Sequence, residues 1–274
     1  MQKTISILLS LFFSISLWGQ DLYDEAHTRQ FANFLYQSRE FKLASVEYER
    51  LVFFDPTDTL ASYYLIKSYR KQGNFRKGLS RANQLFPDNR LAPAHISREK
   101  ALMLLHQRNY LTLFNYLDNS SLEGDDRMLF AVGGRLLQHD YATARSMAEA
   151  ISPDSRTDLQ TMRYLSEEAL RLKYKSPVTS TLLSVLVPGL GKVYTGNWKD
   201  GIFSFLFTTV AIYQAYRGFD QRGINSIYGW GYAALGTGFY LGNLYGSYKA
   251  ANKYNYQQRH ALDHRVEAVF DRMD

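Results

Sequence analysis

The sequence predicts an all-α protein in which a solenoid of helical repeats is followed by a two- or three-helix transmembrane region. Three observations carry this prediction. Apolar residues recur about every 34 positions early in the chain, and charged residues are rare between residues 176 and 248. The third observation is the charge distribution. Residues 1–169 hold 20 Lys and Arg against 20 Asp and Glu, and residues 170–274 hold 12 against 6, which accounts for the net +6. This positive excess flanks the apolar segments, so it indicates membrane anchoring and no nucleic-acid partner.

Residues 1–19 have the composition of a signal peptide. Lys3 supplies the positive charge, and Ile5 to Trp18 contain no charged residue, a run too short for a typical membrane span. Cleavage after Gly19 is the expected outcome, although Leu17 is a poor match at the third position before the cut, and an uncleaved anchor is the alternative. We expect the rest of the protein in the cell envelope of a Gram-negative bacterium, in the inner membrane with the repeats in the periplasm.

Cysteine is absent from the sequence. This excludes disulfide bonds, thiolate metal sites, thiol nucleophiles and a lipoprotein anchor on an N-terminal cysteine. Any attachment to a membrane therefore depends on apolar segments of the protein itself.

Residues 21–174 predict stacked helix pairs with a capping helix at the end. Ala44, Tyr48 and Leu51 recur 34 residues later as Gly78, Ala82 and Leu85. An aromatic residue marks the turn of each pair at positions 41, 75, 110 and 141, with intervals of 34, 35 and 31 residues. Such regularity is typical of helical repeats.

This pattern resembles the tetratricopeptide repeat, clearly over residues 25–88 and more weakly to about 155. Pro56 occupies the place of the proline that follows the second helix in that family, whereas Thr28 and Ala32 replace its tryptophan and glycine. The resemblance implies a concave surface formed by the first helix of each pair. Eight residues are expected to face it: Arg29, Asn33, Tyr36, Tyr63, Lys67, Arg70, Lys71 and Arg98. They would suit an extended acidic peptide or the carboxyl terminus of a polypeptide, and an ordinary solvated helix face is the alternative.

Residues 175–250 have the composition of a membrane domain, and residues 251–274 that of a polar helical tail. The stretches 201–216 and 224–248 approach the length of a bilayer core and end in Tyr and Trp. The stretch 178–191 is shorter and is interrupted at Pro188, so it is either a span or an amphipathic or re-entrant helix. The number of spans, two or three, stays open.

The last apolar stretch carries a stripe of small residues at every fourth position. It consists of Ala234, Gly238, Gly242, Gly246 and Ala250. In lipid, such a stripe allows a second helix to approach closely. We expect it to pack on the preceding span or on another copy of the protein.

A turn motif opens the membrane region. It consists of Pro188, Gly189, Gly191, Tyr194 and Gly196. The motif resembles the PGxGxxYxG signature of a family of small bacterial membrane domains named for their two transmembrane helices, and this resemblance implies membrane placement without implying an activity. Pro188 ends a helix, and the two following glycines permit a tight reversal.

The sequence shows no arrangement of residues typical of catalysis, and we expect neither an enzyme nor a cofactor. His260 and His264 are one helical turn apart, but no general base accompanies them, and we expect no metal site. The favoured hypothesis is a membrane-tethered envelope scaffold or adaptor whose repeats bind a protein or peptide, with lipid as the other partner. The alternative is a subunit of a transport, secretion or assembly complex whose glycine-striped helices oligomerise.

Overall fold

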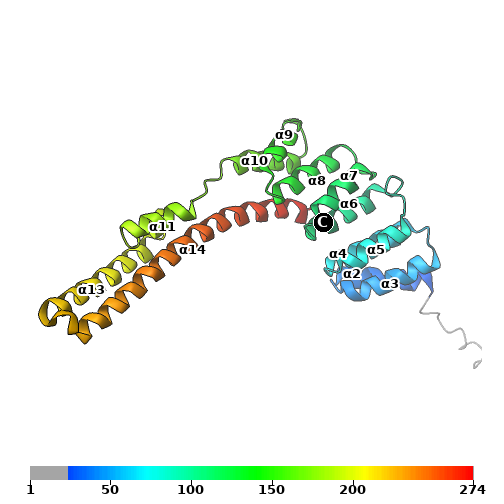
Figure 1. Ribbon diagram of the computed structural model, residues 1–274. Coiled ribbons are helices and arrows are strands. Elements are labelled where there is room, and N and C mark those ends of the chain that lie inside the picture. The colour runs from blue at the N-terminus through cyan, green and yellow to red at the C-terminus, as the bar shows by residue number, and fades with distance from the viewer. Residues whose placement is uncertain (1–23, 274) are drawn as a thin grey trace, which may run out of the picture. The chain divides into compact units, whose positions relative to one another are not determined.

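The structure is a computed structural model that describes residues 24–273, so the predicted signal peptide lies outside it. Within the described residues every regular element is a helix, which confirms the all-α prediction (Figure 1). The protein forms two compact units with a boundary between Gln138 and His139. The first unit contains α2 (Glu25–Gln37), α3 (Phe41–Phe54), α4 (Thr59–Lys71), α5 (Phe75–Leu85), α6 (Ala94–His106), α7 (Tyr110–Asp118) and α8 (Gly124–Leu137).

The helices of the first unit are arranged as a stack of pairs. Each helix from α2 to α8 packs on its neighbour in the sequence, and α4 also contacts α6, as α6 contacts α8. Contacts between alternate helices place the first helices of successive pairs side by side, which is the arrangement of a helical-repeat stack.

Small residues occupy the crossing points between these helices. Ala32, Ala44 and Ala82 are completely buried. A methyl group on Gly78 would lie 2.6 Å from the Met103 sulfur, so that position cannot hold a larger residue without movement. The positions at which Ala44 and Gly78 recur in the sequence are therefore packing positions, as their period predicts.

The aromatic residue predicted at each turn is the first residue of a helix in all four places. Phe41, Phe75, Tyr110 and Tyr141 begin α3, α5, α7 and α9. The residue two positions before each has a left-handed backbone: Arg39, Gly73, Arg108 and His139 have φ between 54° and 76°. One turn geometry is thus repeated four times, and only one of the four copies uses glycine for it.

The second unit contains α9 (Tyr141–Ala148), α10 (Thr157–Leu170), α11 (Pro177–Leu186), α12 (Leu190–Tyr194), α13 (Trp198–Arg222), the short 3₁₀ helix η1 (Gly223–Asn225) and α14 (Ile227–Asp271). Helices α13 and α14 form a hairpin, and α14 also packs on α11, α12 and α10 (Figure 1). The last part of α14 is held to α10 by an ion pair of 2.6 Å between Arg265 and Glu168.

The division into units differs from the prediction at two places. The boundary predicted between residues 174 and 175 lies at 138/139, because α10 packs on α14 and so belongs with the hairpin. The tail predicted at 251–274 is no separate segment: it continues α14, a single helix of 45 residues. Its apolar side chains Leu262, Val266 and Phe270 are buried, a spacing that its many charged residues conceal in the sequence.

None of the helices described here is both long enough and apolar enough to meet the usual hydropathy threshold for a membrane span.

Candidate functional site

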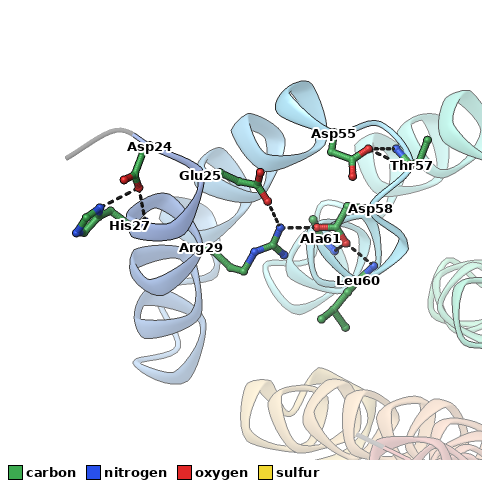
Figure 2. Close-up of polar contacts among 9 residues, drawn as sticks. All are labelled: Asp24, Glu25, His27, Arg29, Asp55, Thr57, Asp58, Leu60 and Ala61. Carbon is green, nitrogen blue, oxygen red and sulfur yellow. Dashed lines mark hydrogen bonds and ion pairs between the residues drawn. The ribbon is translucent and has the colours of Figure 1, made fainter. Parts of the chain in front are cut away.

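The eight residues predicted to line a peptide groove lie in the first unit, and most of them hold this unit together. Arg29 bonds the carboxylates of Glu25 and Asp58, each at 2.7 Å (Figure 2). Asp58 also caps α4, since it accepts hydrogen bonds from the backbone amides of Leu60 and Ala61, both at 2.9 Å. Arg29 therefore fastens α2 to the start of α4.

The carboxylate of Asp58 is held in its charged form. Burial alone raises the pKa of this group, but the backbone amide of Ala61 and the guanidinium of Arg29 outweigh burial and place the pKa below its ordinary value. The pKa values of two further aspartates are lowered by hydrogen bonds: Asp24, at the start of α2, accepts from the His27 amide, and Asp55, at the end of α3, accepts from Thr57 (Figure 2).

The prediction that Arg70 faces a groove is wrong. Its side chain is 7% exposed and forms an ion pair of 2.5 Å with Glu99, which is buried as well. Arg98 is likewise paired, with Asp126 of α8. These arginines connect successive first helices, α4 to α6 and α6 to α8, because charges that face a neighbouring repeat need partners there. The sequence period alone does not show whether a side chain points toward the neighbouring repeat or toward the concave surface.

The remaining predicted residues form a smaller aromatic patch. The Tyr36 ring contacts Tyr48 and Tyr64, and burial raises its pKa to about 12. Asn33 accepts a hydrogen bond of 2.8 Å from the Tyr48 hydroxyl. Lys67 donates to the Tyr63 hydroxyl at 3.0 Å.

Tyr36, Tyr63 and Lys67 each stay half-exposed, and the Tyr63 ring lies edge-on to His95 of α6. We call Tyr36, Tyr63 and Lys67 the aromatic patch. Lys71, at the end of α4, is also half-exposed. The aromatic patch shares its tyrosines and one lysine with the predicted groove. It lacks the three predicted arginines, because Arg29, Arg70 and Arg98 are paired with carboxylates.

In the second unit, the turn motif has a specific backbone geometry. Helix α11 ends before Pro188, and Gly189 has φ 91°. A methyl group on Gly189 would lie 2.0 Å from the carbonyl oxygen of Gly201, and one on Gly191 would lie 1.8 Å from that of Ser180. Only glycine allows these backbones to approach. After this turn, α12 packs back on α11. Gly196 also has positive φ, 87°.

Three buried serines bind this turn to α14, and the sequence pattern gave no sign of them. The Ser180 hydroxyl donates toward the carbonyl oxygens of Gly191 and Ser247, at 2.9 and 2.8 Å. The hydroxyl of Ser184 accepts from the Gly191 amide at 2.9 Å and lies 2.7 Å from the Ser247 hydroxyl. Tyr194 packs beside the turn, with the Lys175 ammonium 4.5 Å from its ring centre.

The stripe of small residues is not the face on which α13 packs. Gly236, Asn243 and Ser247 of α14 are buried, whereas a methyl group on Gly238 or Gly242 would meet no atom within 4 Å. Gly246 is closer to a neighbour, with 3.1 Å to the Lys192 side chain. Ala234 is exposed and Ala250 half-exposed. The stripe was expected to pack on the preceding helix or on another copy of the protein, and α13, the preceding helix, does not pack on it.

The open glycines line a groove along the hairpin with a volume of about 330 Å³. Two buried polar side chains also line it, Thr208 of α13 and Asn243 of α14. Neither the Thr208 hydroxyl nor either end of the Asn243 amide has a hydrogen-bond partner within the described residues. Buried polar groups are nearly always bonded, so these two unsatisfied side chains are unusual.

The hairpin also inverts the usual distribution of side chains. The buried residues of α13, and those of the first part of α14, are small or polar: Gly201, Thr208, Ala211, Ala215 and Gly218 from α13, and Gly229, Gly236, Asn243, Ser247 and Ala251 from α14. The outer surface carries large apolar and aromatic side chains, among them Phe203, Phe207, Val210, Ile212, Tyr213, Ile227, Trp230, Leu241 and Tyr245.

Comparisons of the protein with protein-family models, with curated proteins and with solved structures found no match.

Proposed function

We propose that the protein is a membrane-anchored adaptor of the bacterial cell envelope, in which the α13–α14 hairpin lies in lipid and the first unit binds a protein or peptide. The observation that carries the proposal is the inverted hairpin. Large apolar side chains exposed on both helices are unfavourable in water and favourable in hydrocarbon. Small residues and polar residues between the helices are what membrane helix pairs use for packing.

The geometry of α11 favours two spans over three. Its ten residues extend roughly 15 Å at 1.5 Å per residue, about half of the hydrocarbon thickness of about 30 Å. Two spans return the polypeptide to the side from which it entered. This agrees with the packing of α10, which precedes the hairpin, on the end of α14, which follows it.

Membrane attachment is tested by alkaline carbonate extraction of membranes from expressing cells. We expect the wild-type protein to stay in the pellet. Replacement of Phe203 and Phe207, both 57% exposed, by Asp should release the protein, since each acidic group within a span costs about 2.5–3.5 kcal/mol. Leu111→Asp, at a position of α7 that is 76% exposed, is the matched control and should stay in the pellet. Release of the wild-type protein would contradict the anchor.

Partner binding is tested by a photo-crosslinking amino acid at Tyr63 of the aromatic patch. A defined crosslinked product should form in cells from this position and not from Leu111 of α7. The half-exposed tyrosines support this site, because tyrosine is among the residues that contribute most of the binding free energy at protein interfaces. Absence of any product from the first unit would contradict the adaptor role.

A second candidate function is a subunit of a membrane assembly. The open Gly238 and Gly242 favour it, since exposed glycines four positions apart on a membrane helix allow a second helix to approach closely. Gly242→Leu should abolish a defined oligomer in detergent. Thr237→Leu is the matched control, because Thr237 lies on another face of α14, exposed and bonded only to its own helix. A monomeric wild-type protein would exclude this function.

A further inference from the structure

A second groove lies in the first unit, and neither the repeat pattern nor the proposed adaptor role accounts for it. Its volume is about 430 Å³, within the range of small-molecule sites. Helices α5, α6 and α7 and the segments that flank them contribute its lining: Leu79, Asn83, Asn89, Lys100, Leu104, Gln107, Asn109, Thr112, Asn115, Tyr116 and Asn119. We call it the amide groove, because six of these residues carry side-chain amides.

Lys100 forms the floor of the amide groove. Its side chain is 2% exposed, its ammonium donates to the side-chain oxygen of Asn89, and it lies 5.1 Å from the centre of the Tyr116 ring. No carboxylate among the described residues pairs with it, and burial lowers its pKa to about 8. At neutral pH the groove thus holds a buried positive charge with only uncharged partners, which is costly unless an anion approaches.

The walls of the groove offer free amides. Asn109 is occupied in capping α7, and Asn119 bonds both the Asn115 carbonyl and Arg90. The side-chain amides of Asn83, Gln107 and Asn115 are exposed. Each presents two donors and an acceptor and makes no hydrogen bond within the described residues.

These three amides come from three different places: α5, the end of α6 and α7. The three amides are thus contributed by three separate parts of the first unit, whereas Lys100 lies in the middle of α6. A compact ligand with many hydroxyl groups matches this layout, because each sugar hydroxyl donates and accepts at once, as an amide does. An extended peptide instead presents its polar groups along a line. Leu79 and Leu104 provide aliphatic surface for the carbon face of a sugar ring.

We propose that the amide groove binds a carboxylated oligosaccharide, with the sugar hydroxyls bonded by Asn83, Gln107 and Asn115 and the carboxylate placed against the ammonium of Lys100. A carboxylate fits the single buried cation better than a phosphate does, because a phosphate group carries up to two charges and prefers several cationic donors. The site is independent of the proposed adaptor role and of the membrane hairpin.

The test is isothermal titration of the full-length protein in detergent with three uronate trisaccharides (galacturonate, glucuronate and mannuronate) and with neutral maltotriose. We expect at least one uronate to bind about tenfold tighter than maltotriose, the ratio that corresponds to one charge-assisted hydrogen bond. Lys100→Met, which keeps the length of the side chain and removes its charge, should abolish this preference. Asn83→Leu with Asn115→Leu should weaken both classes of sugar.

Lys42→Met and Gln37→Leu are the matched controls, an exposed cation and an exposed amide outside the groove, and should change neither affinity. Thermal unfolding shows whether each variant is folded. The proposal is overturned if no uronate binds the wild-type protein, or if Lys100→Met keeps the preference. It is also overturned if an acetylated, amidated hexapeptide rich in Glu binds the groove more tightly than every uronate, which would assign the groove to polypeptide.

Discussion

At the scale of single residues, charge in the first unit is buried in two different ways. Arg70 has a carboxylate, Glu99, at 2.5 Å, whereas the neighbouring Lys100 has only uncharged partners. Both side chains are nearly inaccessible. Removal of one member of a buried ion pair destabilises the protein, because the other charge stays buried without a partner. A buried charge that has no charged partner is already unfavourable in the folded protein. Substitutions at the two sites should therefore have opposite consequences.

Removal of Arg70 should strand the charge of Glu99. We expect Arg70→Met to destabilise the first unit by about 3–5 kcal/mol and the double variant with Glu99→Met to recover most of this loss. Urea unfolding of the detergent-solubilised protein, followed by circular dichroism, measures both. Arg127→Met is the control: its partner Asp118 is 68% exposed, so the loss should stay below about 1 kcal/mol. Equal losses for Arg70 and Arg127 would contradict the buried pair.

Lys100 should make the stability of the first unit depend on pH. Burial lowers its pKa from 10.5 to about 8, so the folded state releases this proton more readily than the unfolded state does. The cost of burial is full below pH 8 and disappears as the pH rises toward 10.5. We expect this residue to add about 2 kcal/mol of stability between pH 7 and 9.5. The difference between wild type and Lys100→Met in urea unfolding measures it, and parallel pH profiles would contradict it.

At the scale of elements, the turns between paired helices could be predicted better than the faces of the helices. An aromatic residue at a constant interval locates each turn because it packs at the start of the second helix, and this packing is local. Which way Arg70 or Gly242 points depends on the neighbouring helix. An α-helix that is covered on two sides has the same sequence period for both. The period therefore did not show that Arg70 faces Glu99 of α6, or that Gly242 does not face α13.

The repeated turn geometry gives a matched pair of substitutions. Arg39 has φ 63° at the position where the next repeat has Gly73, with φ 76°. A left-handed backbone costs a residue with a side chain about 1 kcal/mol. Arg39→Gly should therefore stabilise the first unit by about 0.5–1 kcal/mol, and Gly73→Ala, which meets no neighbour within 4 Å, should destabilise it similarly. Thermal unfolding measures both shifts, and shifts of equal sign would contradict the shared geometry.

At the scale of the whole molecule, the sequence pattern predicted the helical stack and the apolar hairpin but could not count the spans. The length of α11 and the packing of α14 on α10 support the proposal of two spans. The Nε2 atom of His139 lies 3.2 Å from a carboxylate oxygen of Asp263, which is 124 positions away in the sequence. Arg265 likewise forms an ion pair with the distant Glu168. Contacts of this range depend on the path of the polypeptide through the hairpin, which no local period records.

The two-span path predicts a definite pattern of accessibility, and the protein is suited to its measurement because it contains no cysteine. Single cysteines at Asp154, Gln221 and Gln257, all exposed, sample the segment before the hairpin, its tip and the segment after it. With a membrane-impermeant maleimide, D154C and Q257C should be labelled in intact spheroplasts and Q221C only after permeabilisation. Three spans would instead place positions 154 and 257 on opposite sides, because each span reverses the side of the polypeptide. Labelling of all three cysteines without permeabilisation would mean that the hairpin does not cross, and the apolar surface of α13 would then require a protein partner.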